Sequence, residues 1–184
     1  MIYLVRHGLD DERYIGGYSD VSLIQEGIEQ VEKTRDYIQK NELLFKRIYS
    51  SDIKRAKETT SIINEKFNKE VIYLKELREQ DKGLLTGLEK ELAYQQYKEF
   101  KNVIDIKTRY PNGESLQDLY NRVNQFLRNL TEDDLLFVTH RGVINMIYYI
   151  LTNIPLDMEK EKFNVTHASI HELDIHTKMI RKLF

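Results

Sequence analysis

Side chains that could bind and transfer a phosphoryl group follow four short apolar runs of the sequence. Each run has the length of a buried strand. The residues concerned are Arg6 and His7 after the first run, Arg55 after the second, Glu79 after the third and His140 after the fourth. Two imidazoles among guanidinium groups suit a tetrahedral oxyanion, because arginine offers a planar pair of donors and keeps its charge when water is removed.

The same residue types could complete a phosphoryl transfer without a metal ion. A neutral histidine can attack phosphorus in line and form a phosphohistidine, which water then hydrolyses. Arginine and histidine side chains would neutralise the charge of the transferred group. The leaving alkoxide needs a proton, and Glu79 is the carboxyl best placed to donate it. The spacing alone does not decide whether His7 or His140 is the nucleophile.

A metal centre is the main alternative for these residues. His7, His140, Glu79 and Asp10 could all be ligands. They do not form an H-x-x-E-H or D-x-D spacing, however, which the common metal sites of this kind require. Taken singly, His140 would be an ordinary histidine at the edge of a core, and Arg55 a solvated charge. Their joint placement after successive strands favours a phosphate site instead.

Alternating strands and helices are expected to position these side chains. Strands are predicted at 2–5, 47–50, 71–74, 135–139 and 169–175, with a last edge strand at 179–184. Helices are predicted at 24–38, 52–67, 90–101, 116–130 and 142–151. This order predicts an α/β domain with a largely parallel sheet and helices on both faces. The carboxyl ends of parallel strands meet at one edge, where such folds place their chemistry.

Composition excludes several other classes of protein. The chain has 184 residues, 28 Lys and Arg against 30 Asp and Glu, a net charge of −2 and no cysteine. It therefore has no disulfide framework, thiolate zinc site or thiol nucleophile, and no basic stripe for nucleic acid. Its most hydrophobic later stretch, Val143 to Leu151, is far shorter than the roughly 20 residues that a membrane span needs. We expect one cytoplasmic domain that binds neither nucleic acid nor membrane.

Six segments resemble, in order, the motifs of the histidine phosphatase superfamily, the phosphoglycerate mutase-like group. They cover nearly the whole chain, so the resemblance is specific although each motif alone is modest. The segments are Tyr3 to Gly8; Gly17 to Leu23 with Gly27; Ile48 to Ala56 with Thr59; Leu77 to Glu79 with Gly83 and Gly87; Pro111 to Ser115 with Arg122 and Val123; and Val138 to His140.

The resemblance implies a fold and a role for each candidate residue. The fold would be a three-layer α/β/α sandwich with a mostly parallel central sheet, and no metal or organic cofactor would be needed. His7 would be the phosphorylated nucleophile and Glu79 the proton donor. Arg6, Arg55 and His140 would hold the phosphoryl oxygens, so that His140 is both catalytic and phosphate-binding.

The loop after His7 departs from the family's common pattern. Leu9 and Asp10 stand where the family often has Glu or Gln followed by Thr. The loop to Gly17 is about three residues shorter than usual. The arginine common in that loop has no clear counterpart, and Arg13 is the candidate replacement. These changes concern substrate recognition more than the phosphate pocket.

Other candidate substrate-binding residues lie further along the chain. Thr86 stands where a glutamate is common, and Arg141 stands where a glycine is common. Arg141 is either an extra ligand for a phosphate or carboxylate or a surface charge. Lys82 and Arg109 could bind a second anionic group, although solvated charges are the more usual case. The aromatic residues that could line the entrance are Tyr94, Tyr97, Phe100 and Tyr110.

Hydrolysis is predicted rather than mutase chemistry. A mutase must shield its phosphorylated intermediate from water, which requires a lid. Only about 30 residues separate Glu79 from Arg109, enough for one helix at roughly 1.5 Å per residue and its loops. We therefore expect residues 80–112 to form a small cap over the site of a phosphatase that acts on a small phosphorylated metabolite.

Three alternatives remain at this point. The chain could be a phosphoglycerate-type mutase, or an enzyme that removes phosphate from phosphohistidine in a signalling protein. It could also be a non-catalytic module that binds phosphorylated ligands, although such a module would be expected to have lost His7 or Glu79, and both are present. The oligomeric state does not follow from the sequence, although an exposed last strand would permit edge pairing.

Overall fold

A six-stranded sheet forms the centre of the computed structural model, which describes residues 1–159 and 161–184. The strand order is β3-β2-β4-β1-β5-β6. The first four strands in this order run parallel, while β5 pairs antiparallel with β1 and β6 pairs antiparallel with β5. The strands are β1 (Ile2–Arg6), β2 (Arg47–Ser51), β3 (Val71–Leu74), β4 (Leu135–Thr139), β5 (Ile170–Asp174) and β6 (Met179–Lys182).

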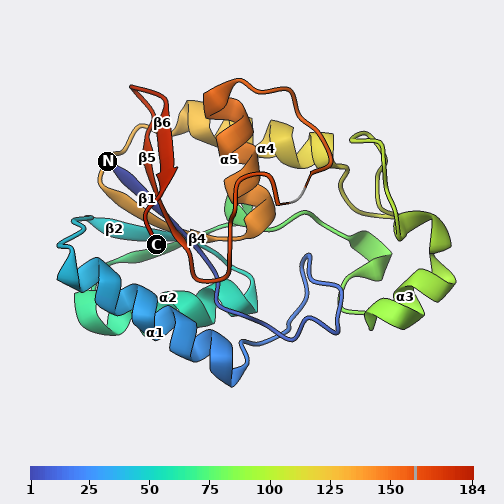
Figure 1. The fold of residues 1–184 in the computed structure, drawn as a ribbon, viewed down its shortest axis with the longest axis horizontal. Helices are drawn as coiled ribbons and strands as arrows, with labels where there is room; N and C mark the ends of the chain where they lie inside the picture. The colour runs from blue at the N-terminus through green and yellow to red at the C-terminus, as the bar shows by residue number, and fades with distance from the viewer. Residues whose placement is uncertain (160) are drawn as a thin grey trace.

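Helices cover both faces of the sheet, so the predicted three-layer α/β/α arrangement is confirmed (Figure 1). The covering helices are α1 (Gln25–Lys40) and α2 (Lys54–Phe67) on one face, and α4 (Leu116–Asn129) and α5 (Arg141–Thr152) on the other. Successive strand residues point to opposite faces. Thus Leu4 of β1 packs in the core under α4 and α5, and its neighbour Val5 packs in the core under α1 and α2.

The start of α4 shows how the local sequence sets a helix boundary. Ser115 Oγ accepts a hydrogen bond from the Asp118 backbone N–H, and the Asp118 carboxylate accepts one from the Ser115 backbone N–H. This reciprocal pair satisfies two donors that a helix start otherwise leaves unpaired. Asn112, in the turn just before this helix, adopts a φ of 59°, a left-handed conformation that asparagine tolerates.

The segment between β3 and α4 differs from its prediction. A single helix was expected at 90–101, but α3 (Lys90–Gln96) ends early and a separate 3₁₀ turn follows at Lys98–Phe100. Tyr97 breaks the helix with a φ of −123° and a ψ of 62°. The break turns Phe100 back against Tyr110, where the two rings stack with centroids 5.1 Å apart. Aromatic packing thus overrides helix continuation here.

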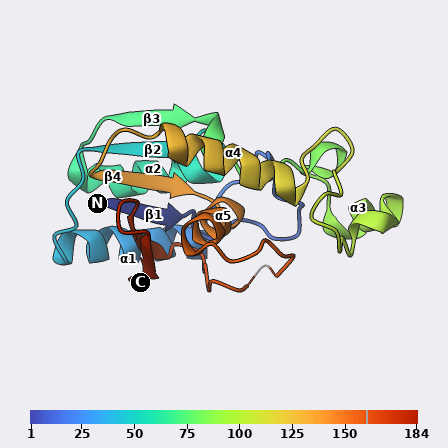
Figure 2. The same cartoon turned by 90° about the horizontal axis from the view of Figure 1, so that it is seen from above.

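The carboxyl ends of the parallel strands all point to one edge of the sheet. The part of the chain around α3 (residues 80–112, the α3 segment) projects beyond that edge (Figure 2). Because β5 runs the other way, its amino-terminal end lies at this same edge, with Ile170 paired to Val5. In the described part of the chain, the helices are all too short or too polar to cross a membrane.

Candidate active site

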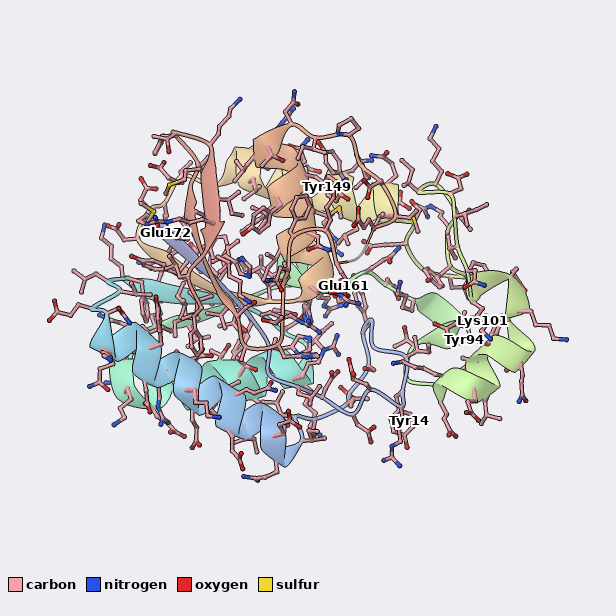
Figure 3. The ribbon with its side chains drawn as sticks, viewed as in Figure 1. Tyr14, Tyr94, Lys101, Tyr149, Glu161 and Glu172 are labelled. Atoms are coloured by element: carbon pink, nitrogen blue, oxygen red, sulfur yellow. The ribbon has the colours of Figure 1, made fainter. Side chains whose placement is uncertain are left out.

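A cavity of about 520 Å³ opens at the carboxyl edge of the sheet. Of the five residues singled out by the sequence, Arg6, His7, Arg55 and Glu79 line it. His140 is fully buried beside it, with its ring centroid 5.1 Å from that of His7. Tyr94 and Lys101 wall the cavity on the α3 side, Tyr149 walls it on the α5 side, and Tyr14 stands in the loop after β1 (Figure 3).

His7 is held with one ring nitrogen directed at the backbone. Its Nδ1 lies 2.7 Å from the Gly8 carbonyl oxygen, so Nδ1 carries the proton and Nε2 keeps its lone pair. Burial lowers the pKa of His7 well below its usual value, and the charges of Arg55, His140 and Arg6 lower it further. His7 is therefore a neutral imidazole whose Nε2 is unprotonated, the form that a nucleophile needs.

Arg55, in the first turn of α2, lies directly against this nitrogen. Its Nε donates to His7 Nε2 at 3.2 Å, and its side chain is 2% exposed. The other guanidinium nitrogens donate to the Gly17 carbonyl oxygen at 2.9 Å and to Ser19 Oγ at 3.3 Å. The Asp10 carboxylate oxygen Oδ2 lies 3.4 Å from Arg55 Nε. Arg55 is thus fixed by the loop after β1, which brings the first two predicted motifs together.

Arg6, at the end of β1, is fixed by the loop that precedes β5. Arg6 Nη1 donates to the Val165 carbonyl oxygen at 2.8 Å, and Arg6 Nη2 lies 2.5 Å from His167 Nε2. Burial lowers the pKa of Arg6 to about 10, and the charge of Arg141 contributes. Its Nε is buried and has no hydrogen-bond partner among the described residues. A buried donor of this kind is costly unless something pairs with it.

His140 precedes α5 and offers a second buried nitrogen without a partner. Ser51 Oγ accepts from the Ile53 backbone N–H at 3.3 Å and lies 2.8 Å from His140 Nε2. His140 Nδ1 is buried without a partner in the described chain. Burial and the charge of Arg55 lower the pKa of His140 well below its usual value, so the ring is neutral. A hydroxyl that donates to Nε2 leaves the ring proton on Nδ1, where it suits an anionic oxygen.

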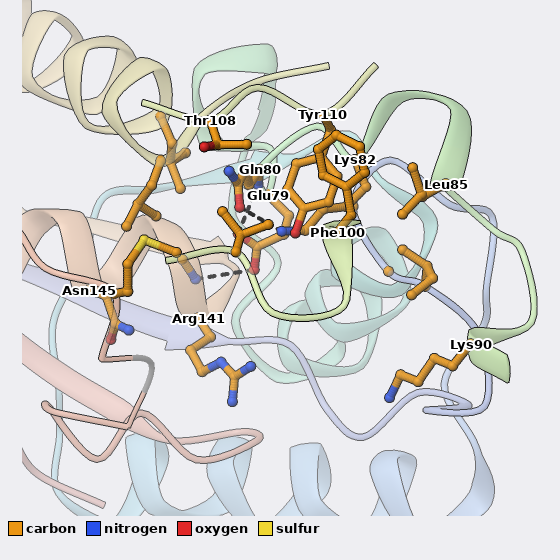
Figure 4. Close-up of a pocket in the computed structure, with 18 of the residues that line it drawn as sticks. Glu79, Gln80, Lys82, Leu85, Lys90, Phe100, Thr108, Tyr110, Arg141 and Asn145 are labelled. Atoms are coloured by element: carbon orange, nitrogen blue, oxygen red, sulfur yellow. Dashed lines mark hydrogen bonds between the residues drawn. The ribbon is translucent and has the colours of Figure 1, made fainter. Parts of the chain in front are cut away.

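Glu79 is held at the amino-terminal end of α5 by two backbone donors (Figure 4). Its carboxylate accepts from the Gln80 N–H at 2.8 Å and from the Gly142 N–H at 3.1 Å. Arg122 donates to the Glu79 carbonyl oxygen at 3.1 Å. A Cβ added at Gly142 would lie 2.1 Å from Glu79 Oε1, so the carboxyl occupies space that only glycine leaves free.

Comparison with known proteins identifies the family of the chain. A family model of the histidine phosphatase superfamily, branch 1, matches residues 2–183. The chain belongs to this superfamily. Among its relatives, the phosphoglycerate mutase-like protein 4 of Arabidopsis thaliana is 34% identical over 162 residues, covering 80% of this chain and 69% of the relative.

A second relative and a solved structure carry different names. The probable phosphoglycerate mutase GpmB of Escherichia coli is 28% identical over 183 residues, covering 94% of this chain and 84% of the relative. The alpha-ribazole phosphatase of Shigella flexneri has a TM-score of 0.81 at 23% identity, covering 99% of this chain and 94% of that chain, a likeness of fold. These two relatives of the chain are thus named after phosphoglycerate mutase, while a protein of the same fold is named as a phosphatase.

The candidate substrate-binding residues of the chain fall into two groups. Lys82 and Arg141 line the cavity. Arg13 and Arg109 are not among its lining residues: Arg13 pairs with Asp11, and its side chain is 75% exposed. Arg109 pairs with Asp118 at 2.8 Å and is 66% exposed. The structure thus brings two of the four to the cavity and leaves two on the surface.

Three of the four aromatic residues expected at the entrance line the cavity. They are Tyr94, Phe100 and Tyr110. Tyr97 is not a lining residue and packs instead against the small apolar cluster of the α3 segment, whose buried members are Ile15, Leu85 and Ala93. The cluster joins the loop after β1 to the α3 segment, so the two sides of the entrance are packed together.

His167 is a site residue that the sequence did not reveal. It contacts Arg6, its ring centroid lies 5.7 Å from that of His7, and burial lowers its pKa to about 3. The strand after it was predicted, but not its direction. Because β5 is antiparallel, its start lies at the carboxyl edge of β1, and Ala168 N–H donates to the His7 carbonyl oxygen at 3.1 Å.

His167 also gives the metal hypothesis a different set of ligands from the one expected. The ligand atoms of His7, Asp10 and His167 lie within 4.8 Å of one another. However, Nε2 of His7 faces Arg55 and Nε2 of His167 faces Arg6. A cation at this position would lie against two guanidinium groups. Coulomb repulsion between the cation and these two positive charges opposes its binding. The same charges favour an anion.

Proposed function

We propose that this histidine phosphatase is a metal-independent phosphomonoester hydrolase acting on a small phosphorylated metabolite in the cytoplasm. The observation that carries this proposal is the unprotonated Nε2 of His7 beside two buried nitrogens that have no hydrogen-bond partner among the described residues, Arg6 Nε and His140 Nδ1. With the ring proton of His140 on Nδ1, a phosphoryl group would pair with both nitrogens while its phosphorus faces the nucleophile.

In the first step, His7 Nε2 attacks phosphorus and the ester P–O bond breaks. Arg6, Arg55 and His140 stabilise the charge on the non-bridging oxygens, which is the main demand of phosphoryl transfer. Glu79 gives its proton to the departing alkoxide, so that the alcohol leaves neutral. The products of this step are the alcohol, the phosphohistidine at His7 and the Glu79 carboxylate.

In the second step, water takes the place vacated by the alcohol. The Glu79 carboxylate accepts a proton from this water as its oxygen attacks phosphorus. The P–N bond to His7 breaks, inorganic phosphate leaves, and both side chains return to their starting forms. Water is the only reactant consumed besides the ester.

We further propose that the chain is one domain in which residues 80–112 cap the site. The α3 segment projects past the strand ends and supplies lining residues such as Tyr94 and Phe100 (Figure 2). Its rim is open to solvent, since Ile104 lines the cavity and is 89% exposed. Access of water favours hydrolysis over a mutase, which must protect its phosphoenzyme. The mutase remains the second candidate because relatives at 34% and 28% identity carry that name.

The test is phosphate release from a panel of esters in the presence of EDTA, with the His7→Ala variant alongside. The panel contains p-nitrophenyl phosphate, phosphoglycerates, sugar phosphates, nucleotides and a phosphohistidine peptide. Release that persists in EDTA and falls by about 10³-fold or more in His7→Ala supports the proposal. Release abolished by EDTA, or retained in His7→Ala, contradicts it. Interconversion of phosphoglycerates without phosphate release would favour the mutase.

A further inference from the structure

Besides the phosphate pocket, the cavity has two cationic side chains in its wall. Lys82 and Arg141 both line it and are drawn in the same close-up (Figure 4). The charge of Arg141 is near enough to lower the pKa of Lys82 and, at the other end of the cavity, that of Arg6. Positive charge therefore extends from the phosphate pocket along the wall of the cavity, beyond what a single phosphoryl group requires.

Lys82 is positioned rather than free. Its Nζ donates to Gln80 Oε1 at 2.6 Å and lies 4.1 Å from the centre of the Tyr110 ring. The Gln80 amide is itself oriented, because its Nε2 donates to the Glu114 carbonyl oxygen at 3.2 Å. The lysine stem packs on the loop after β1, where a Cβ at Gly17 would lie 2.9 Å from Lys82 Cγ.

Lys82 has no carboxylate within ion-pair distance among the described residues, unlike the arginines around it. Arg122 pairs with Glu114 at 2.8 Å, and Arg78 pairs with Asp52 at 2.5 Å. An ammonium group has three donors, and Gln80 uses one of those on Lys82. Burial lowers the pKa of Lys82 to about 8, so the group is still mainly protonated at neutral pH.

The partner of Arg141 is exchangeable. Arg141 pairs with Glu161, whose side chain is 71% exposed. Exposed ion pairs contribute little to stability because water competes for both partners. An anionic group of a bound ligand could therefore replace Glu161 at low cost, and it would find Lys82 on the other side of the cavity.

We propose that Lys82, together with Arg141, binds a second anionic group of the substrate. The substrate would then be a phosphomonoester whose alcohol part carries a carboxylate or a second phosphate close to the ester bond. This rests on the proposed function, since Glu79 marks the side from which the alcohol leaves. Lys82 selects the substrate, whereas the phosphate pocket performs the reaction.

The test compares three esters built on the same three-carbon chain. Glycerol 3-phosphate has an uncharged tail, 3-phosphoglycerate has a carboxylate tail, and propane-1,3-diol bisphosphate has a phosphate tail. The measured quantity is the ratio of kcat/KM for each charged-tail ester to kcat/KM for glycerol 3-phosphate. The variants are Lys82→Met, which keeps the length of the side chain, and Lys98→Met as the matched control. Lys98 is an exposed lysine of the same segment that is not a lining residue.

The wild-type enzyme is expected to prefer one charged-tail ester by about tenfold or more, the effect of a hydrogen bond between charged groups. Lys82→Met should reduce this ratio by about tenfold, and Lys98→Met should leave it unchanged. The charged ester that is preferred identifies the second group as carboxylate or phosphate. A wild-type ratio near one, or a ratio that Lys82→Met does not change, overturns the inference. p-Nitrophenyl phosphate has no second anion and therefore tests the proposed function alone. If it is hydrolysed while the charged-tail preference is missing, only the inference about Lys82 fails. If neither it nor any of the three esters is hydrolysed, the proposed function and the inference both fail.

Discussion

The phosphate pocket and the cap side of the cavity are built on different principles. In the pocket, Arg6, His7, Arg55 and His140 are all buried and each is fixed by a backbone or buried side-chain partner. On the cap side, cationic side chains pair with exposed carboxylates, as Arg141 does, or with no carboxylate in the described chain, as Lys82 does. Residues at the strand ends and in the first turn of α2 thus hold the groups that would perform the chemistry, while the loop with Lys82 and the start of α5 present the groups that would choose the ester.

Glu79 belongs to both regions, and its replacement should have the largest effect of the changes considered next. Glu79→Gln removes the transferable proton but keeps the shape of the side chain. Hydrolysis of glycerol 3-phosphate should slow by about 10²-fold, the usual contribution of a general acid. Hydrolysis of p-nitrophenyl phosphate should slow less, because nitrophenolate leaves without a proton. Equal slowing of the two esters, measured as kcat, would remove Glu79 from the role of acid.

Predictability from sequence follows the same division. The strand ends of the parallel sheet locate Arg6, His7, Arg55, Glu79 and His140, because a period-two pattern marks strands and parallel strands end at one edge. The structure brings all five together.

Residues presented by loops and by antiparallel pairing were harder to find. His167 was missed because strand direction cannot be read from an apolar run. Arg13 and Arg109 were plausible by type, but nearby carboxylates, Asp11 and Asp118, hold them on the surface. After the break at Tyr97, Phe100 stacks on Tyr110, a contact between distant residues that helix propensity does not contain.

The backbone contact at Gly142 offers a smaller change to the same acid. In Gly142→Ala the new methyl group would meet Glu79 Oε1, which must move because the Cβ position lies 2.1 Å from it. We expect turnover of glycerol 3-phosphate to fall by about tenfold, since small displacements of a catalytic group are costly. The same substitution made in Glu79→Gln should have little further effect, as in a double-mutant cycle. Additive losses would show that Gly142 matters for another reason.

Stability provides a separate contrast between the two regions. The pKa of Lys82 is about 8 in the folded chain against an ordinary value of 10.5, so below pH 8 the folded state bears the cost of a buried charge. This cost is at most about 3 kcal/mol, reduced by partial contact with solvent. Lys82→Met should therefore raise Tm at pH 7.

The pH dependence of this gain has a definite sign. Between pH 8 and pH 10.5 the unfolded chain binds more protons at Lys82 than the folded chain does. The free energy of unfolding of the wild type therefore rises with pH across this range. The Tm advantage of Lys82→Met over the wild type should shrink accordingly. Thermal melts of both proteins at pH 7 and pH 10 measure it. A Tm advantage of the variant that stays constant across this range would contradict the assignment of a buried ammonium.

The smallest effects are expected at the two arginines outside the cavity. Arg13→Ala and Arg109→Ala each break an exposed ion pair, which contributes little to stability because water competes for both partners. Turnover of p-nitrophenyl phosphate should stay within about twofold of wild type, because neither side chain lines the cavity. A tenfold rise in KM for either variant would place that arginine in substrate binding and blur the division between the two regions.

The central claim is that the neutral Nε2 of His7 is the atom that becomes phosphorylated. The most direct test is to quench the enzyme during turnover of p-nitrophenyl phosphate at alkaline pH, which preserves phosphohistidine, and to locate the phosphoryl group by mass spectrometry of its peptides. The account predicts one phosphoryl group on the peptide containing His7, and none after His7→Ala. A phosphoryl group on the peptide containing His140, or turnover in the variant without any phosphohistidine, would contradict it.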